Sequence, residues 1–333
     1  MSTMLILLFI AACFLAYSNG ANDNFKGVAT LFGSGTTNYK KAINWATITT
    51  FTGAVTAIFL ADELVKNFSG KGLVPNELIQ APTFAIAIAL GAAFTVFFAT
   101  KIGMPISTTH SLVGALFGAG VMAVGSEFNF EKLGNTFLMP LFVSPLMAAI
   151  LSLIAYLIFK FLRKQFPSLL KENPTFLGIS THKILDSLHY LSSGVVSFAR
   201  GLNDTPKIVG LLLILNAIDI EWSMVSIAIV MALGGLFNAK KVGETMSKKI
   251  TKMNAGQGFT ANMITGVLVT TASVHGLPVS TTHVSVGSLF GIGTATKKAD
   301  YKMIAKIVLS WVLTLPIAAI ISGVVFKILE SIS

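Results

Sequence analysis

The chain has 333 residues, of which 53% are hydrophobic and 11% are charged. Soluble domains carry about 25% charged residues, so a mean hydropathy of +0.77 leaves too few ionised groups to cover a water-soluble globule. The net charge of +10 does not indicate nucleic-acid binding, because the lysines fall in short clusters between apolar runs. A single cysteine, Cys13, excludes an internal disulfide framework and a cysteine-based zinc site. The composition predicts an all-α membrane protein.

Eight apolar runs of about 20 residues each are long enough to cross the hydrocarbon core of a bilayer. In chain order they cover residues 2–18, 42–61, 82–100, 136–160, 184–199, 222–239, 259–275 and 303–326. Four stretches are too short, too rich in glycine or too closely joined to a neighbour to be ordinary spans, and we expect half-helices or re-entrant hairpins at 24–33, 107–125, 206–218 and 279–294. The first run lacks a basic segment before it, so we expect it to be retained rather than cleaved as a signal peptide.

Clusters of basic residues predict the orientation in the membrane. They are Lys40 and Lys41; Lys160, Arg163, Lys164, Lys171 and Lys183; Lys240, Lys241, Lys248, Lys249 and Lys252; and Lys297, Lys298, Lys302 and Lys306. If each run crosses once, and the stretches at 107–125 and 279–294 either cross as well or fold back with the span before them as a hairpin, all four clusters fall on one side. The positive-inside rule assigns that side to the cytoplasm. We therefore expect a multi-pass protein of the cell membrane with both termini extracytoplasmic.

Two polar blocks each occur twice, in the same order. Gly-Ala-Asn-Asp at 20–23 matches Gly-Leu-Asn-Asp at 201–204, and Gly-Met-Pro-Ile-Ser-Thr-Thr-His at 103–110 matches Gly-Leu-Pro-Val-Ser-Thr-Thr-His at 276–283. The chain thus divides into two repeats, residues 1–165 and 181–333, joined by a cytoplasmic linker at 166–180. An odd number of crossings in each repeat predicts an inverted-repeat transporter, with its site near the midplane where broken helices of the two repeats meet.

The first repeated block carries an asparagine and an aspartate in each repeat. An ionised aspartate is costly in hydrocarbon and requires pairing, water or a bound ion. Helix capping is the simpler interpretation, but it does not account for symmetric pairs in two repeats. Hard cations prefer carboxylate, amide and backbone carbonyl oxygens, and a helix break at Gly20 or Gly201 would expose such carbonyls. The candidate cation ligands are Asn22, Asp23, Asn203 and Asp204.

The second repeated block places hydroxyl groups directly after a Gly-x-Pro helix breaker. Free amides and the positive end of the helix dipole favour an oxyanion there. The alternative is that these hydroxyls only satisfy the break or bond to a carbonyl one turn back. Because the whole block occurs twice, we favour two helix starts that hold one tetrahedral oxyanion from opposite directions. The candidate residues are Ser107, Thr108, Thr109, Ser280, Thr281 and Thr282.

Other polar residues near these blocks carry weaker signals. Lys26, Lys207 and Arg200 either assist an anion or snorkel and neutralise the aspartates, and we favour the second. For His110 and His283, a neutral imidazole bonded to a carbonyl is at least as well supported as a proton relay. Neither histidine has a second metal ligand at helical spacing, so the sequence predicts no cofactor and no transition-metal site.

The paired blocks, taken together, resemble those of the inorganic phosphate transporter (PiT) family along the whole chain. The resemblance implies secondary active uptake of phosphate, driven by sodium in some members and by protons in others, by a homodimer that moves a transport domain against a scaffold. This chain departs from the family pattern at residues 24–27, where Asn-Phe-Lys-Gly replaces Val-Ala-Asn-Ala, and at Thr50, where many members have glutamate. The short linker resembles that of the compact microbial form.

The sequence therefore predicts a secondary active symporter, not an enzyme, that imports inorganic phosphate with sodium as the coupling ion. Phosphate would lie between the two Ser-Thr-Thr segments, with sodium bound at Asp23 and Asp204. A proton-coupled phosphate transporter and a sulfate transporter remain alternatives. An anion channel would not need acidic residues beside the anion, and a phosphate-ester hydrolase would need a nucleophile with an oriented base. The expected partners are phosphate, sodium, the lipid bilayer and a second copy of the chain.

Overall fold

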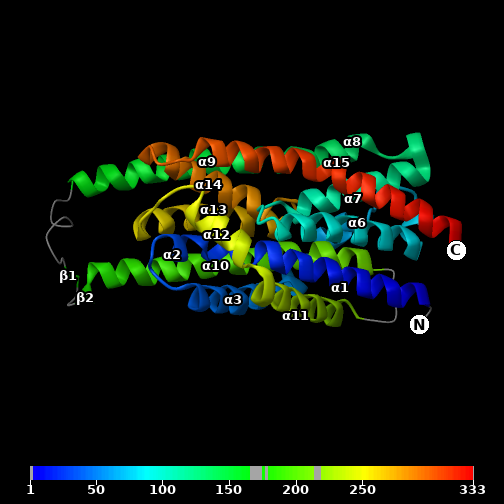
Figure 1. Ribbon diagram of the computed structural model, residues 1–333, viewed down its shortest axis with the longest axis horizontal. Coiled ribbons are helices and arrows are strands. Elements are labelled where there is room, and N and C mark those ends of the chain that lie inside the picture. Colours follow the sequence, from blue (N-terminus) through cyan, green and yellow to red (C-terminus); the bar gives the residue numbers. More distant parts are fainter. Residues whose placement is uncertain (1–2, 166–174, 177–178, 214–218, 333) are drawn as a thin grey trace.

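The computed structural model describes residues 3–165, 175–176, 179–213 and 219–332 as an elongated bundle of helices (Figure 1). Within this part of the chain, seven helical segments are long and apolar enough to cross a membrane. The expected all-α membrane protein is confirmed. The strands found in the described residues are β1 (Thr175–Phe176) and β2 (Ile179–Ser180), which pair antiparallel. Most of the predicted linker at 166–180 lies outside the described residues.

The first repeat forms its helices largely where the apolar runs predict them. In chain order the elements are α1 (Thr3–Asp23), η1 (Lys26–Val28), α2 (Ala29–Gly33), α3 (Tyr39–Leu60), α4 (Asp62–Phe68), α5 (Asn76–Ile79), α6 (Pro82–Lys101), α7 (Thr108–Val124), η2 (Gly125–Glu127), α8 (Phe130–Lys132), η3 (Leu133–Leu138) and α9 (Met139–Gln165). Local sequence sets several helix starts. The Asn38 side chain accepts from the amide of Lys41 before α3, and Pro82 lies in the first turn of α6, where a missing N–H costs nothing.

The second repeat follows the same order with fewer short elements. It contains α10 (Thr181–Val209), η5 (Gly210–Leu212), α11 (Ile220–Asn238), α12 (Lys240–Lys248), α13 (Ala255–Val274), α14 (Thr281–Thr296) and α15 (Tyr301–Ile332). A capping box between Asn254 and Gln257 starts α13. The predicted runs at 184–199 and 259–275 form α10 and α13, which are not among the seven apolar segments because polar side chains occupy much of their buried faces. The stretch at 107–125, expected as a half-helix, is among them.

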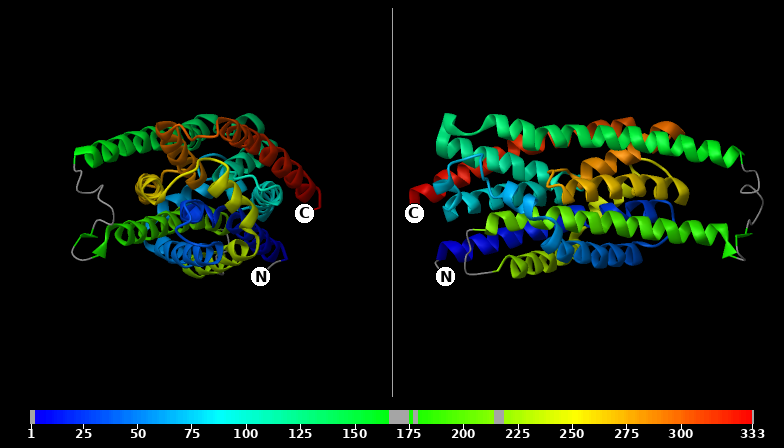
Figure 2. Two further views of the ribbon diagram at one scale, coloured as in Figure 1. Left: turned by 60° about the vertical axis from the view of Figure 1, so that its left-hand side comes forward. Right: turned by 180° about the vertical axis from the view of Figure 1, so that it is seen from behind.

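Matching helices of the two repeats run in opposite directions along the bundle. Figure 1 shows this for α1 and α10 and again for α9 and α15. The two termini lie at one end of the bundle, and Figure 2 shows α9 and α10 projecting beyond the other helices toward the β1–β2 hairpin at the opposite end. The packing is also matched: α1 contacts α6 and α11, as α10 contacts α13 and α3, while α7 packs on α15 and α14 on α9. The repeats therefore interlock rather than form separate bodies.

Two glycines of the first repeated block allow this close packing. A Cβ on Gly20 would lie 1.9 Å from the carbonyl oxygen of Met231 in α11, and a Cβ on Gly201 would lie 2.0 Å from that of Thr50 in α3. Both glycines lie inside regular helix, and the Gly20 carbonyl accepts from the amide of Asn24. The expectation that these glycines expose carbonyl ligands at a helix break is wrong, because they serve helix packing instead.

The helix breaks differ between the repeats. In the first, α1 ends at Asp23 and a turn leads into η1. In the second, α10 continues through Asp204 to Val209 with Pro206 inside it. The expected break next to Asp204 is therefore wrong: the chain leaves α-helical geometry only at η5, and residues 214–218 of the expected half-helix lie outside the described part.

The Gly-x-Pro segments join paired helices, α6 to α7 and α13 to α14. Gly103 and Gly276 adopt φ values of 74° and 70°, which explains why the block requires glycine at this position. The proline that follows favours an extended residue before it and so ends the helix. Each pair thus delivers the start of its second helix to the middle of the bundle.

Candidate functional site

Five charged side chains are buried in the described part of the chain, and they form one cluster. Only Asp, Glu, Lys and Arg are counted here. The five are Asp23, Lys26, Arg200, Asp204 and Lys207, and each is at most 3% exposed. Buried charges in a membrane protein are costly and mark functional positions. They come from α1 and η1 in the first repeat and from α10 in the second, so the opposed helices bring them together.

The ammonium group of Lys26 is surrounded by oxygen atoms. Its Nζ atom donates to Asp23 Oδ1 at 2.6 Å, to Asn22 Oδ1 at 2.9 Å, to the carbonyl of Ile106 at 2.7 Å and to Thr282 Oγ1 at 2.6 Å. The last of these partners belongs to the second repeat. Lys26 therefore connects the aspartate of its own repeat to the Ser-Thr-Thr segment of the other.

Lys207 makes the mirrored connection. Its Nζ atom donates to Thr109 Oγ1 and to the carbonyl of Val279, both at 2.7 Å, and lies 3.5 Å from Asp204 Oδ1. The threonine belongs to the first repeat and the aspartate to the second. The two lysines thus cross between the repeats in opposite directions.

The second oxygen of each aspartate faces the middle of the cluster, where Asn19 lies. Asn19 Nδ2 is 3.4 Å from Asp23 Oδ2, 3.1 Å from Asp204 Oδ2 and 3.0 Å from Thr108 Oγ1. Thr108 also donates to Asp23 Oδ2 at 3.3 Å. An amide has two N–H donors, so three oxygens around one nitrogen exceed what it can satisfy. Two carboxylate oxygens and one hydroxyl therefore converge at the boundary between the repeats.

Arg200 closes the cluster on the side of α10. Its guanidinium donates to the side-chain oxygens of Asn19 and Asn24 and to Thr50 Oγ1, and its Nε atom lies 3.6 Å from Asp204 Oδ2. Asp204 consequently has two cationic neighbours, Arg200 and Lys207. The five buried charges comprise three cations and two carboxylates, so the cluster carries one net positive charge when all are ionised.

All six predicted Ser and Thr residues are buried near the repeat boundary, but they have different partners. Ser107 and Ser280 cap α7 and α14 by accepting from the amides of His110 and His283, so for these two serines the capping role holds. The threonines differ in their partners according to their position in the block. The structure therefore brings both Ser-Thr-Thr segments to the charged cluster.

The last threonine of each block crosses to the other repeat. Thr109 Oγ1 lies 3.2 Å from the carbonyl of Val279, and Thr282 Oγ1 lies 3.0 Å from that of Ile106. Thr281 stays within its own repeat and accepts from Asn203. Hydroxyl and ammonium donors from both repeats thus meet around the same two carbonyls, an arrangement suited to an anion rich in acceptor oxygens.

The two predicted asparagines tie the aspartate helices to these segments. Asn22 Oδ1 accepts from Lys26 and from the amide of Ile106, while Asn203 Nδ2 donates to the carbonyl of Val279 at 3.1 Å. Asn203 Oδ1 accepts from Ser273. The oxygen of Asn22 therefore faces the cluster, and that of Asn203 is engaged on α13.

Sequence reasoning missed several members of the cluster. The prediction that Lys26, Lys207 and Arg200 snorkel is wrong, since their side chains are buried, although all three lie beside aspartates. Asn19 was not identified; its signal is that it occupies the repeat position of Arg200, four residues before the aspartate. The backbone carbonyls that face the cluster are those of Ile106 and Val279, directly before the serines. The sequence had suggested carbonyls near the aspartates.

The two repeated histidines lie side by side behind the Ser-Thr-Thr segments. The rings of His110 and His283 are 4.4 Å apart between centroids, and His283 stacks on Trp311 at 3.8 Å. His283 Nδ1 lies 3.4 Å from the carbonyl of Leu141. Their packing between helices supports a structural contact across the repeats.

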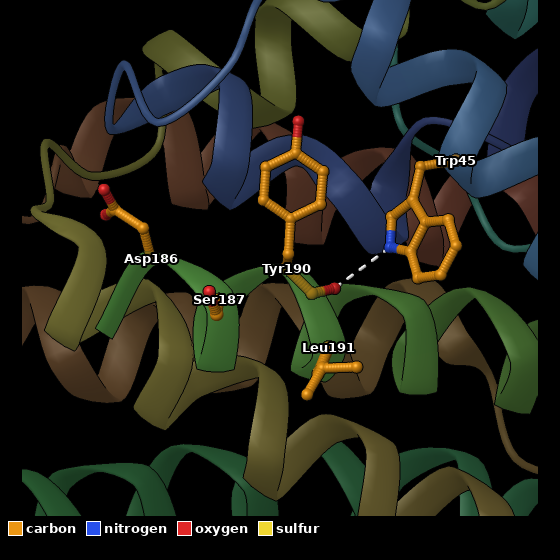
Figure 3. A pocket seen from close by; sticks show the side chains of 5 residues that line it. All are labelled: Trp45, Asp186, Ser187, Tyr190 and Leu191. Atoms are coloured by element: carbon orange, nitrogen blue, oxygen red, sulfur yellow. Dashed lines mark hydrogen bonds between the residues drawn. The ribbon is translucent and has the colours of Figure 1, made fainter. Parts of the chain in front are cut away.

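A surface pocket of about 430 Å³ lies away from this cluster, between α3 and α10 (Figure 3). It is lined by Trp45, Asp186, Ser187, Tyr190 and Leu191, and the Trp45 indole donates to the carbonyl of Tyr190 at 3.0 Å. None of these residues contacts the buried charges in the interactions described above. The buried cluster, rather than this pocket, is the candidate site.

Comparison with known proteins assigns the chain to a family. The model of the phosphate transporter family matches residues 19–322. A protein of Bacillus subtilis, named as a low-affinity inorganic phosphate transporter, is 28% identical over 100% of both chains, and one of Rhizobium meliloti with the same name is 28% identical over 97% of this chain and 96% of its own. A solved structure described as the sodium-dependent phosphate transporter matches with a TM-score of 0.86, 26% identity and 100% of both chains.

These similarities cover the charged cluster and both Ser-Thr-Thr segments, because the family match begins at Asn19 and extends beyond α14. They also agree with a bundle of membrane-spanning helices. The chain therefore belongs to the phosphate transporter family, and it is a multi-pass membrane transporter of phosphate rather than an enzyme.

Proposed function

We propose that the chain is a secondary active symporter that imports inorganic phosphate with sodium as the coupling ion. The observation that carries the proposal is the convergence of both Ser-Thr-Thr segments on a buried cluster with a net positive charge. Alternating access would exchange which of two inverted repeats, residues 1–165 and 181–333, seals this cluster.

In this proposal phosphate binds where the two repeats meet. Thr109 and Thr282, which now bond to carbonyls of the opposite repeat, would turn their hydroxyls toward phosphate oxygens. The ammonium groups of Lys26 and Lys207 already touch these two hydroxyls and would follow them. The first turns of α7 and α14, which contain Ser107, Thr108, Ser280 and Thr281, would add helix-dipole stabilisation.

Sodium would bind between the two aspartates. Asp23 Oδ2, Asp204 Oδ2 and Thr108 Oγ1 all lie within 3.4 Å of one atom, Asn19 Nδ2, and a sodium ion favours such oxygen ligands. Asn22 and Asn203 are proposed to support this site from the flanking turns. With one sodium ion and a divalent phosphate, the net positive charge of the cluster would be cancelled, which lowers the cost of crossing the bilayer.

The same charge balance makes proton coupling the second candidate. A monovalent phosphate, which carries one more proton, would neutralise the cluster without any sodium. A chain working in this way would import phosphate under an inward proton gradient alone. Sulfate carries no proton at neutral pH and is therefore always divalent. By charge balance it would need a sodium ion, as divalent phosphate does.

Phosphate uptake into liposomes tests the proposal. Purified full-length protein is reconstituted, and labelled phosphate is measured with an inward sodium gradient, an inward proton gradient or neither, with sulfate and arsenate as competitors. We expect the sodium gradient to drive accumulation and sulfate to compete weakly. Accumulation driven only by protons would replace sodium by the second candidate, and no gradient-driven phosphate accumulation at all would contradict symport.

The assembly and orientation belong to the same proposal. We propose a homodimer in the cell membrane, with both termini extracytoplasmic because the lysine clusters favour the opposite side. Crosslinking in native membranes would detect the dimer, and labelling of a cysteine introduced at either terminus from outside the cell would test the orientation.

A further inference from the structure

The surroundings of the Lys26 ammonium resemble those of a bound metal cation. Its four partners are a carboxylate, a side-chain amide oxygen, a backbone carbonyl and a hydroxyl, at 2.6–2.9 Å. Hard monovalent and divalent cations in proteins take these oxygen types. An ammonium has three N–H donors, so four oxygens at these distances form a cation cage rather than a set of ordinary hydrogen bonds.

The Lys207 ammonium occupies the corresponding place in the second repeat with one oxygen fewer, because Asn203 Oδ1 accepts from Ser273 instead. A carbonyl, a hydroxyl and a carboxylate surround it, and each corresponds by repeat position to a Lys26 partner: Val279 to Ile106, Thr109 to Thr282 and Asp204 to Asp23. The duplicated blocks therefore form two cation positions. Each lies next to the Oδ1 atom of an aspartate, whose Oδ2 atom faces Asn19. Both positions hold the end of a lysine side chain.

We propose that Lys26 and Lys207 are tethered cations: their ammonium groups occupy two positions that would otherwise bind free sodium. Phosphate is then carried with two fewer mobile cations than a lysine-free site of the same design would need. This rests on the proposed function for its link to transport, whereas the occupancy of the two cages is a binding property that stands apart from transport.

Comparison with an exposed ion pair shows what is special about these lysines. Lys66 pairs with Glu63 at 2.8 Å, with the same three-residue spacing as Lys26 and Asp23. The side chains of Lys66 and Glu63 are both more than half exposed. In the described contacts the Lys66 ammonium has Glu63 as its hydrogen-bond partner. Water replaces the lysine when such a pair is broken, but the buried aspartates have no comparable access to solvent.

Sodium binding to purified protein tests the inference without phosphate. The full-length chain in detergent is titrated with radioactive sodium in choline medium, and thermal unfolding is followed in sodium and in choline. The variants are Lys26→Ala and Lys207→Ala, with Lys66→Ala as the matched control. Each buried-site variant should bind one more sodium ion per chain than the unaltered protein, and sodium should raise its unfolding temperature more than it raises that of Lys66→Ala.

A paired substitution identifies the ligand. Adding Asp23→Asn to Lys26→Ala removes the carboxylate of the emptied cage, so the extra sodium ion should be lost. Sodium binding by Lys26→Ala and Lys207→Ala that equals that of Lys66→Ala would overturn the inference. So would variants that unfold in sodium as readily as in choline, because sodium would then be unable to replace the ammonium.

Transport measurements separate this inference from the proposed function. In liposomes the ratio of sodium to phosphate carried by Lys26→Ala should exceed that of the unaltered protein by one. If the unaltered protein fails to carry phosphate while the variants gain a sodium ion, the proposed function is wrong and the tethered cations stand. If phosphate is carried but no variant gains a sodium ion, the proposed function stands and the inference of tethered cations is wrong.

Discussion

The two repeats present matching aspartates, lysines and Ser-Thr-Thr segments to the centre of the bundle, but they differ in charge at one position. Each supplies an aspartate, a lysine and a Ser-Thr-Thr helix start, and these cross to the other repeat through Thr109 and Thr282. At the position four residues before the aspartate, however, the first repeat has Asn19 and the second has Arg200. The symmetric groups suit an anion held from two sides, whereas the asymmetric pair gives the cluster its one net positive charge.

The aspartates therefore differ in their surroundings. Asp23 pairs closely with Lys26 at 2.6 Å, at the end of a helix. Asp204 lies inside α10, with Lys207 at 3.5 Å and Arg200 at 3.6 Å. The two aspartates therefore hold matching places in the repeats but have different numbers of cationic neighbours.

Neutralising the aspartates should produce the largest effects. Asp23→Asn leaves one buried cation without its partner and Asp204→Asn leaves two, so both should abolish sodium-coupled uptake, and Asp204→Asn should destabilise the protein more. Breaking a buried pair costs about 3–5 kcal/mol. Uptake in liposomes and unfolding temperatures check this, with the exposed Glu63→Gln as the control. Unchanged sodium dependence in both variants would remove these residues as sodium ligands.

Alanine at the packing glycines should have the next largest effect, equal in the two repeats. Gly20→Ala and Gly201→Ala each place a methyl group against a backbone carbonyl, at 1.9 and 2.0 Å. Overpacking of this kind costs roughly 1–3 kcal/mol or more. Gly134→Ala, where the added carbon meets open space, is the matched control for thermal unfolding. Equal stability of all three variants would contradict the close approach of α1 to α11 and of α10 to α3.

Removing one crossing hydroxyl should weaken phosphate binding to a similar extent from either side. Thr109→Val and Thr282→Val keep the side-chain shape but remove the group that touches the opposite lysine. The loss of one such hydrogen bond, about 1–1.5 kcal/mol, corresponds to a roughly tenfold rise in phosphate KM. Thr52→Val, at an exposed position on α3, is the control. A rise in KM for one variant alone would show that a single repeat binds the anion.

Loss of a helix cap should have the smallest effect. Ser107→Ala and Ser280→Ala each remove an acceptor for the third amide of a helix, which costs about 1 kcal/mol. The unfolding temperature should fall slightly, and by the same amount in both variants. The ratio of sodium to phosphate transported should stay unchanged. A changed ratio would place the serine hydroxyls among the cation ligands.

Repetition explains how much of this arrangement the sequence predicted. The long helices, the two helix starts and the meeting of Asp23 with Asp204 follow from hydropathy and from blocks that occur twice. Asn19 escaped notice because a single amide in an apolar helix has no counterpart of its own kind. The lysines were misjudged because spacing places a side chain on a helix but does not reveal that carbonyls from another repeat will surround it.

Backbone geometry was harder to predict than site membership. Gly20 and Gly201 suggested breaks, yet the neighbouring helices required their small size. A helix break was expected beside Asp204, but α10 continues past it to Val209 with Pro206 inside the helix. Glycine and proline have several structural uses, and the partner helix that selects among them is distant in sequence.

The location of the bound anion shows whether both repeats bind phosphate together. Arsenate, a tetrahedral analogue of phosphate that scatters anomalously, should be soaked into crystals of the full-length protein grown in sodium. We expect one arsenic peak between Thr109 and Thr282, in contact with both Lys26 and Lys207. A peak confined to one repeat, or one in the pocket beside Trp45 and Tyr190, would contradict it.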